Sequence, residues 1–474
     1  MREPANPGDL KFKVAPDLDW KAGDLLGLAP TNMDATAYEY VTIKSYNAGS
    51  GEVEAEEKLK AYHYGAPDST GDKYRGVDMR GEVLLLSRNI MITSNQEKNS
   101  THLTHPDPWP CRVIVADFFE PSDLTLRTGE IMWDGVGIHD CSQTETEHAA
   151  LKFINAAKGD KVVKNSVLAR GNGIGIDIAT SKKVKLQNNA IFDMVEYGVR
   201  ATAASDITLE DNILVGVTPN MTRPGLLMEW ENVNGGFDLI DASSMTVRNN
   251  TAAGTWHSGF RVPGVACEAS KPSNVIEDNI AHSISGFGAL VPEGEGDCSK
   301  FTKFYGYKNA QATVFMNTGK ESRAEENISI DSHYGIVAFA GQHVEVRNNY
   351  IYGSEGMQNT DCPGVPSGKC DCDSRLGAMA PTFGGALKVL EKAGDIGKLF
   401  KVGGGWGGTS LFEGNEFIGF DSPKSACGGS QHAVGNNIKH SDYHPQSIWK
   451  RNSFINTDEK AMFKLYSPPQ GWAN

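Results

Sequence analysis

A short pattern that contains asparagine recurs along the middle of this chain at nearly constant intervals. Each copy has a strand-forming run, a bend with asparagine, and then a small or apolar run. The interval is 24 residues from Asn165 to Asn189, 23 from Asn189 to Asn212, and 22 from Asn327 to Asn349. A period of this length in strand-rich sequence is typical of a solenoid.

The period matches the size of one coil of a parallel β-helix. Three strands of about five residues and three bends take up roughly this many residues. Asparagine suits the bends because it tolerates left-handed backbone angles and its amide can hydrogen-bond locally. Stacked coils would place these amides one above another in a ladder. The sequence therefore predicts an all-β chain whose main part is a right-handed parallel β-helix.

The first part of the chain has a different pattern. Residues 38–43 alternate between apolar and polar, which predicts a half-buried strand. Residues 83–92 form a near-continuous apolar run, which is typical of a strand buried on both faces. We expect a truncated β-sandwich-like cap over 1–100, because an open coil exposes unpaired strand edges. The β-helix is then expected over 101–474, with a cysteine- and glycine-rich insert at about 355–410.

The charge of the chain restricts its partners. Its 474 residues include 45 Lys and Arg against 59 Asp and Glu, so the formal net charge is −14. An acidic chain is poorly suited to bind nucleic acid or an anionic membrane surface. Neutral glycans and other proteins stay compatible with it. No apolar run is long enough to cross a bilayer, so no direct membrane insertion is expected from this chain.

Cysteines and glycosylation motifs favour an oxidising compartment. The chain has eight cysteines, an even number that suits disulfides. A Cys- and Asp-rich run at 361–373 has no known zinc spacing, so loop disulfides are the preferred interpretation and no metal is expected there. No cofactor is expected, and calcium binding between coils is left open. Asn-x-Ser/Thr acceptors are found at Asn99, Asn220, Asn249 and Asn327.

Three stretches resemble one family of cell-surface proteins. Residues 19–24 (DWKAGD) and 77–90 (VDMRGEVLLLSRNI) resemble the later part of an eight-glycine domain, and 110–115 (PCRVIV) completes the set. The combination is similar to fibrocystin and especially to fibrocystin-like proteins, and the cell-surface hyaluronidases share this two-part layout. The similarity continues through 259–262 and 417–420 and covers nearly the whole chain.

The resemblance implies a location and a disulfide. Fibrocystin-like proteins are large single-pass proteins of cilia and secretory surfaces, of which this chain would be one part. The start of the chain shows no hydrophobic leader, which agrees with such a part. The resemblance also implies a disulfide between Cys267 and Cys298, with two free buried thiols as the alternative. Cys111 and Cys141 are a second candidate pair.

One departure concerns catalysis. The hyaluronidase-like members carry a His-x-His stretch after their first coil, where this chain has Ala-Ala-Leu-Lys-Phe-Ile at 149–154. This difference counts against hyaluronan cleavage. In the fibrocystin branch no catalytic activity is established.

Charged residues on the coils are the candidates for chemistry. Enzymes with this fold place carboxylates, arginine or lysine on one face of adjacent coils. Asp177, Arg200, Asp238 and Arg261 each lie on or near a strand that precedes a bend. Asp177 is flanked by two isoleucines, so it points outward if they point inward. A solvated strand face is the preferred interpretation of these residues, and Asp177, Asp238 and Arg261 are the candidate catalytic residues otherwise.

Three functions follow from these patterns. The leading hypothesis is a stiff extracellular or cell-surface module that binds glycans or proteins. The second is a polysaccharide-cleaving enzyme, hyaluronidase- or lyase-like, which requires carboxylates from three neighbouring coils to converge. The third is a structural segment of a surface or ciliary coat. Trp256 beside His257 is the aromatic–polar pair most worth testing.

Overall fold

The computed structural model describes most of the chain between its first residue and residue 466. The described residues are 1–94, 110–144, 146–218, 235–269, 273–318, 320–332, 334–339, 343–353, 376–379, 409–419, 432–437, 446–457, 459 and 463–466. The elements assigned in these ranges are all strands. The predicted insert at about 355–410 lies almost entirely outside these ranges. No helix in the described ranges is long and apolar enough to span a membrane.

The chain divides into two compact units. Unit 1 comprises Met1–Pro224, Asn234–Arg261 and Ser273–Ser283. Unit 2 comprises Gly225–Val233, Val262–Pro272 and Ile284–Asn474.

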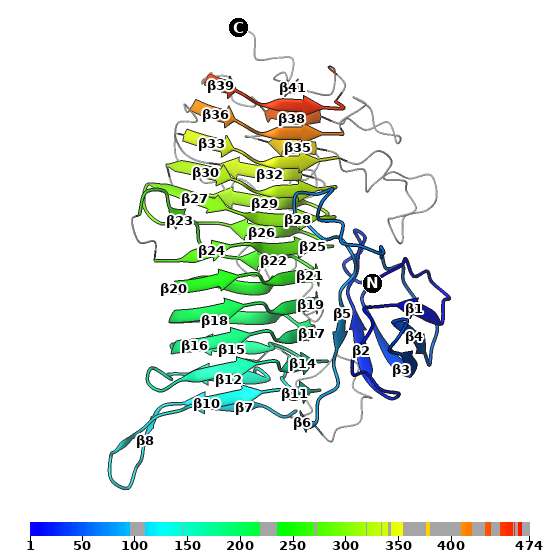
Figure 1. Cartoon of the computed structure of the whole chain (residues 1–474). Coiled ribbons are helices and arrows are strands. Elements are labelled where there is room, and N and C mark those ends of the chain that lie inside the picture. Colours follow the sequence, from blue (N-terminus) through cyan, green and yellow to red (C-terminus); the bar gives the residue numbers. More distant parts are fainter. Residues whose placement is uncertain are drawn as a thin grey trace. The chain divides into compact units, whose positions relative to one another are not determined.

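Unit 1 begins with a five-stranded antiparallel sheet in the order β1-β4-β3-β2-β5 (Figure 1). The strands are β1 (Lys11–Lys13), β2 (Leu25–Leu28), β3 (Glu39–Asn47), β4 (Glu52–Ala55) and β5 (Val83–Leu85). The first half of β3 alternates between buried and partly exposed residues, as its sequence predicts. Its buried side chains join an apolar core with Phe12, Leu26, Leu28 and Val53.

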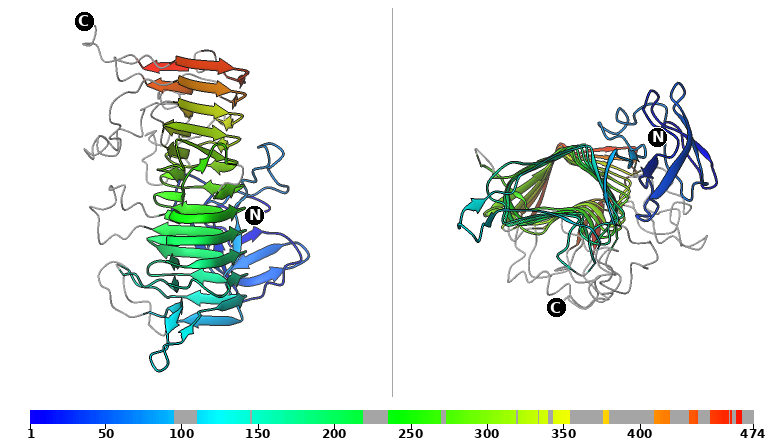
Figure 2. Two further views of the ribbon diagram at one scale, coloured as in Figure 1. Left: turned by 90° about the vertical axis from the view of Figure 1, so that its left-hand side faces the viewer. Right: turned by 90° about the horizontal axis from the view of Figure 1, so that it is seen from below.

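The other strands of unit 1 build a parallel β-helix. Each strand pairs in register with a strand one coil later, so each coil extends the same sheets (Figure 2). One sheet contains β7 (Val113–Ala116), β10 (Ile131–Asp134), β12 (Leu151–Ile154), β13 (Lys161–Lys164), β15 (Ile176–Ala179), β16 (Lys182–Gln187), β18 (Tyr197–Glu210), β20 (Gly235–Arg248), β22 (Ser258–Arg261) and β24 (Val275–Glu277). The other contains β6 (Ile90–Thr93), β11 (Val136–His139), β14 (Val167–Ala169), β17 (Ala190–Val195), β19 (Ile213–Thr218), β21 (Thr251–Thr255) and β25 (Asn279–His282). A hairpin of β8 (Phe118–Phe119) and β9 (Leu126–Arg127) projects from the first coil.

Unit 2 is also a parallel β-helix, with three sheets. The first is β26 (Phe287–Val291), β29 (Ala312–Asn317), β32 (Tyr334–Phe339), β35 (Leu376–Met379), β38 (His432–Asn437) and β41 (Phe463–Tyr466). The second is β28 (Phe304–Tyr307), β31 (Ile328–Ile330), β34 (Tyr350–Tyr352), β37 (Glu416–Ile418) and β40 (Ser453–Ile455). The third is β23 (Val265–Ala266), β27 (Cys298–Thr302), β30 (Glu321–Glu325), β33 (His343–Arg347), β36 (Thr409–Glu413) and β39 (Gln446–Lys450).

A buried asparagine stands at the same bend of successive coils, and in some coils a second asparagine precedes it. Asn188 and Asn249 have φ of 50° and 54°, in the left-handed region that asparagine tolerates. The next residue in each case is buried and hydrogen-bonds to the neighbouring coil: Asn189 Nδ2 donates to Asn212 Oδ1 at 2.9 Å, and Asn212 Nδ2 donates to Asn250 Oδ1 at 2.9 Å. The predicted asparagine ladder is therefore confirmed. In unit 2 it runs through Asn327, Asn349, Asn415 and Asn452.

The N-terminal sheet is fixed to the flank of the coils in unit 1. Tyr38 and Tyr40 of the sheet donate hydrogen bonds to the two carboxylate oxygens of Asp193 in β17, at 3.0 and 2.9 Å. Both rings also pack edge-on against Phe192. Burial, followed by the charge of Asp193, raises the pKa of both phenols. The expected cap thus lies against the side of the coils rather than over their first turn.

Candidate functional site

Five charged residues occupy one register position on adjacent strands of the unit 1 sheet. The register pairs Lys152 of β12 with Asp177 of β15, and Asp177 with Arg200 of β18. It continues from Arg200 to Asp238 of β20, and from there to Arg261 of β22. The charges alternate in sign, and four strand spacings give the row a length of about 19 Å. We refer to these five residues as the charge ladder.

The ladder lies on the outer face because its neighbours along each strand point inward. Ile176 and Ile178, on either side of Asp177, are fully buried. Two and three coils further on, Phe237 and Phe260 occupy the register position of Ile176 and stack inside the β-helix with ring centroids 4.8 Å apart. Since side chains alternate along a strand, the residue between two inward ones faces out. The apolar interior therefore sets the direction of every ladder side chain.

Asp177 is outward-facing yet has no solvent exposure. Lys152 Nζ lies 2.9 Å from its carboxylate, and Arg200 makes a two-pronged contact through Nε at 3.0 Å and Nη2 at 3.1 Å. A buried carboxylate is stable only when it is paired and hydrogen-bonded in this way. The solvated strand face preferred from the sequence is therefore wrong at this position.

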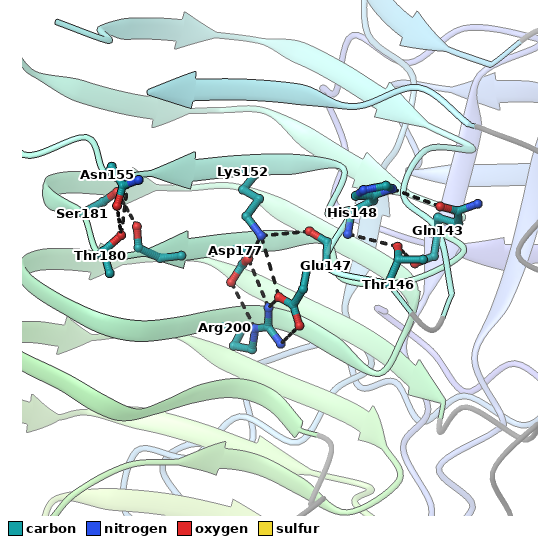
Figure 3. A network of polar contacts seen from close by, with 11 residues as sticks. Gln143, Thr146, Glu147, His148, Lys152, Asn155, Asp177, Thr180, Ser181 and Arg200 are labelled. Atoms are coloured by element: carbon teal, nitrogen blue, oxygen red, sulfur yellow. Dashed lines mark hydrogen bonds and ion pairs between the residues drawn. The ribbon is translucent and has the colours of Figure 1, made fainter. Parts of the chain in front are cut away.

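Glu147 contacts the same two cations from the solvent side (Figure 3). Its carboxylate accepts hydrogen bonds from both terminal nitrogens of Arg200, the one from Nη1 at 3.4 Å, and lies 3.7 Å from Lys152 Nζ. The Glu147 side chain is 69% exposed, in contrast to Asp177. Burial by itself would lower the pKa of Arg200. The hydrogen bonds to Asp177 and Glu147, together with the charges of these two residues, outweigh burial, so the pKa of Arg200 is raised. Arg200 is therefore held as a permanent cation.

The other end of the ladder is a simpler pair. Arg261 Nη1 contacts the two oxygens of Asp238 at 3.3 and 3.1 Å. Burial raises the pKa of Asp238, although Arg261 opposes this shift. Burial, and then the charge of Asp238, raises the pKa of nearby Tyr197 to about 12. The guanidinium of Arg200 lies 5.6 Å from the centre of the Tyr197 ring, a cation–π contact.

The candidate carboxylates do not converge as a glycan-cleaving site requires. Asp177 and Asp238 are separated in register by Arg200, which places their strands about 9.6 Å apart. Asp177 is inaccessible, and both carboxylates are engaged in ion pairs. General acid–base catalysis needs a carboxyl group that can reach the substrate and exchange a proton with it. The ladder therefore lacks the arrangement that the enzyme hypothesis predicted.

Trp256 and His257 precede the last strand of the ladder. They form the turn between β21 and β22, and the Trp256 side chain is exposed. His257 is mostly covered, and this burial lowers its pKa to about 4. The histidine is therefore neutral at physiological pH, and the indole offers an apolar surface near the Arg261 strand.

The structure forms both candidate disulfides. Cys111 and Cys141 are bonded in unit 1, with Cα atoms 4.7 Å apart. Cys267 and Cys298 are bonded in unit 2, with Cα atoms 5.5 Å apart. No cysteine in the described ranges is free.

The four glycosylation motifs differ in their surroundings. Asn249 is exposed at a bend and is accessible as an acceptor. Asn327 is completely buried, donating to the carbonyl oxygen of Phe301 and to Asn349 Oδ1. The Asn327 prediction is therefore wrong for the folded protein, because a glycan there would break the ladder. Asn99 and Asn220 lie outside the described residues.

Sequence reasoning missed two members of the site. Lys152 precedes Asp177 by 25 residues (177 − 152), which is close to one coil period, so its spacing was an available signal. Glu147 is placed by the loop before β12 and has no periodic relation to the ladder. In the described part of the chain, the ladder included, no group of three or more His, Cys, Asp or Glu side chains is placed to hold a metal ion.

Comparison with known proteins identifies the fold. A family model described as the right-handed β-helix region matches residues 153–301, which include four of the five ladder residues. Together with the parallel sheets, this match identifies a right-handed parallel β-helix. No curated protein matches the sequence.

Three solved structures of phage tailspikes are similar to this chain in a structural comparison. They come from Acinetobacter baumannii bacteriophage AP22, in complex with A. baumannii capsular saccharide, and from Pseudomonas phages LKA1 and phi297. Each is 8% identical to this chain, with TM-scores of 0.29, 0.25 and 0.25. They cover 99%, 99% and 95% of this chain, which spans 64%, 63% and 61% of theirs, less than two thirds in each case.

Proposed function

We propose that this chain is a stiff extracellular or cell-surface module that binds glycans along the outer face of its unit 1 sheet. The charge ladder is the observation that supports this proposal. Its cations keep part of their side chains exposed, 11% for Lys152, 19% for Arg200 and 21% for Arg261. Buried carboxylates hold these donors in place. Binding a ligand would therefore cost little side-chain entropy, because the donors are already ordered.

The chemistry of the row suits a sugar chain. A glycan presents hydroxyl groups at repeated intervals, and the ladder presents donors on every second strand, about 9.6 Å apart. Arginine offers several N–H donors in one plane, which favours contact with neighbouring oxygens. The exposed Trp256 ring, on the turn before the Arg261 strand, adds an apolar surface on which a sugar face can stack.

The extracellular part of the proposal is supported by covalent chemistry. Two disulfides within the described residues are typical of proteins that fold in an oxidising compartment. We further propose that the chain is part of a larger fibrocystin-like protein of secretory or ciliary surfaces, as the resemblance of residues 77–90 implies. Protease treatment of intact cells that express the full protein tests this location. Resistance of the chain on intact cells would contradict it.

Glycan binding is tested with one variant and a matched control. Arg261→Ala removes the terminal donor of the ladder. Arg248→Ala removes an arginine from β20, one that pairs with Glu277 at 2.6 Å outside the ladder. Purified chains are applied to a glycan array, and the strongest ligand is titrated by calorimetry. We expect Arg261→Ala to weaken binding about fivefold or more, and Arg248→Ala to leave it unchanged.

Each result bears on one of the functions. No bound glycan in any condition overturns the proposal and favours a structural segment or a protein-binding module. Equal losses in both variants place the binding site away from the ladder. Cleavage of any polymer, followed by size-exclusion chromatography, overturns the view that the module only binds.

A further inference from the structure

Two carboxylates share the cations Lys152 and Arg200, and only one of them is part of the sheet. Asp177 lies beneath the cations and has no solvent exposure. Glu147 reaches them from the loop before β12 and is largely exposed (Figure 3). The cations therefore present a second anion position on the solvent side, which is filled by a side chain of the chain itself.

The loop keeps its conformation through bonds that do not use the Glu147 carboxylate. Thr146 Oγ1 donates to the carbonyl of Gln143 at 3.0 Å and accepts from the backbone N–H of His148 at 3.1 Å. His148 Nδ1 and Gln143 Oε1 are also within hydrogen-bond distance, 3.0 Å apart. Lys152 Nζ donates to the backbone carbonyl of Glu147 at 2.9 Å, so its position does not depend on the carboxylate either. A rotation of the Glu147 side chain would therefore vacate the outer anion position without opening the loop.

We propose that the Glu147 carboxylate stands in the place of a ligand carboxylate, and that the ladder binds acidic sugars of the uronate type. This inference rests on the proposed glycan binding and names its substrate class. The ligand carboxylate would accept hydrogen bonds from the terminal nitrogens of Arg200 and pair with Lys152. Asp177 would keep both cations oriented during the exchange.

Local charge agrees with an acidic ligand despite the acidity of the whole chain. With Glu147 in place, the site holds three cations (Lys152, Arg200, Arg261) and three carboxylates (Glu147, Asp177, Asp238). When the Glu147 side chain swings away, the ladder itself holds three cations against two carboxylates. At physiological salt the remaining charge of the chain is screened beyond about 8 Å. The local excess of positive charge therefore determines whether the ladder attracts an anionic ligand.

The test uses one sugar polymer in two forms. Oligogalacturonate carries a carboxylate on every residue, and its fully methyl-esterified form has the same backbone without these charges. Both are titrated by calorimetry against wild-type chain, Glu147→Ala and the control Glu277→Ala. The two variants lose the same charge, but Glu277 pairs with Arg248 outside the ladder. A thermal melt of each variant confirms folding.

We expect wild type to prefer the acid form, and Glu147→Ala to bind that form about fivefold more tightly because the internal competitor is gone. The affinity for the ester and the affinities of Glu277→Ala should stay at the wild-type values. Unchanged or weaker binding of the acid by Glu147→Ala overturns the inference, and so does equal binding of acid and ester. Absence of binding to any sugar instead overturns the proposed glycan function itself.

Discussion

Arg200 lies between two carboxylates whose different burial gives them different energetic roles. Asp177 is sealed under the cations, so its loss would leave buried positive charge without compensation. Glu147 is mostly in water, where an ion pair contributes little to stability. The same guanidinium therefore takes part in a structural pair on one side and a replaceable pair on the other.

This difference predicts unequal effects of two similar substitutions. Asp177→Asn should lower the free energy of unfolding by about 3 kcal/mol, because Lys152 and Arg200 lose their buried counterion. Glu147→Gln should cost less than about 1 kcal/mol. Urea denaturation followed by circular dichroism measures both. Equal losses would show that the two carboxylates are equivalent.

His257 predicts a loss of stability in mild acid. Its pKa is about 4 in the folded chain and about 6.5 when unfolded, so the unfolded state takes up the proton first. The contribution of neutral His257 to the free energy of unfolding is complete above pH 6.5 and declines as the pH falls from 6.5 to 4. Wild type should lose about 1–2 kcal/mol more than His257→Gln between pH 7.5 and pH 5, as measured by urea denaturation. The same pH profile in both chains would contradict this role.

At the level of the element, two neighbouring positions at the bend have separate tasks. The first adopts the left-handed bend and is exposed at Asn188 and Asn249, while the second is buried and connects coils. Asn212 accepts from both the backbone N–H and the side chain of Asn189, and donates to Leu186 O and Asn250 Oδ1. Removing that amide leaves several buried groups without partners.

Substitutions at the two positions should therefore differ in cost. Asn212→Ala should lower the free energy of unfolding by roughly 3 kcal/mol, because buried donors and acceptors are left unpaired. Asn188→Gly keeps the left-handed bend and should change the free energy of unfolding by less than about 0.5 kcal/mol. Guanidinium titrations of the two variants supply the comparison. A large effect at Asn188 would mean that the bend, and not the ladder, stabilises the coils.

The sequence was informative about the elements because their determinants are local. Asparagine spacing predicted the coils and their ladder, and alternation around Asp177 indicated its outward direction. Four of the five ladder residues were named from their places before bends, although 38 residues (238 − 200) separate Arg200 from Asp238, well beyond one coil period. Glu147 could not be predicted, because its position depends on the three-dimensional course of a loop. Burial of Asp177 likewise depends on the neighbours that cover it.

At the scale of the whole molecule, stability is distributed over neighbours in a stack. Each coil of a solenoid contacts only the coils next to it, so such chains can unfold in parts. The chain has two compact units, and each contains one of the disulfides. A covalent change in one unit should therefore act mainly on that unit.

Calorimetry should show two thermal transitions with separate dependence on the two disulfides. Replacing Cys111 and Cys141 by serine opens a link between residues 30 apart and should destabilise the first unit by about 3–4 kcal/mol. Replacing Cys267 and Cys298 should do the same to the second unit only. A single transition that responds equally to both double variants would show that the units unfold together.

The asparagine ladder also bears on how this protein ages. Slow hydrolysis converts an asparagine amide to a carboxylate, which replaces a donor by an oxygen. At Asn212 that oxygen would face the carbonyl of Leu186 and Oδ1 of Asn250, both of them acceptors. Because all the amides of the row are oriented alike, one deamidated coil would repel its neighbour and weaken the stack at that level. The burial that makes the ladder stabilising also keeps water from this reaction, so chemical lifetime and fold stability are protected by the same residues.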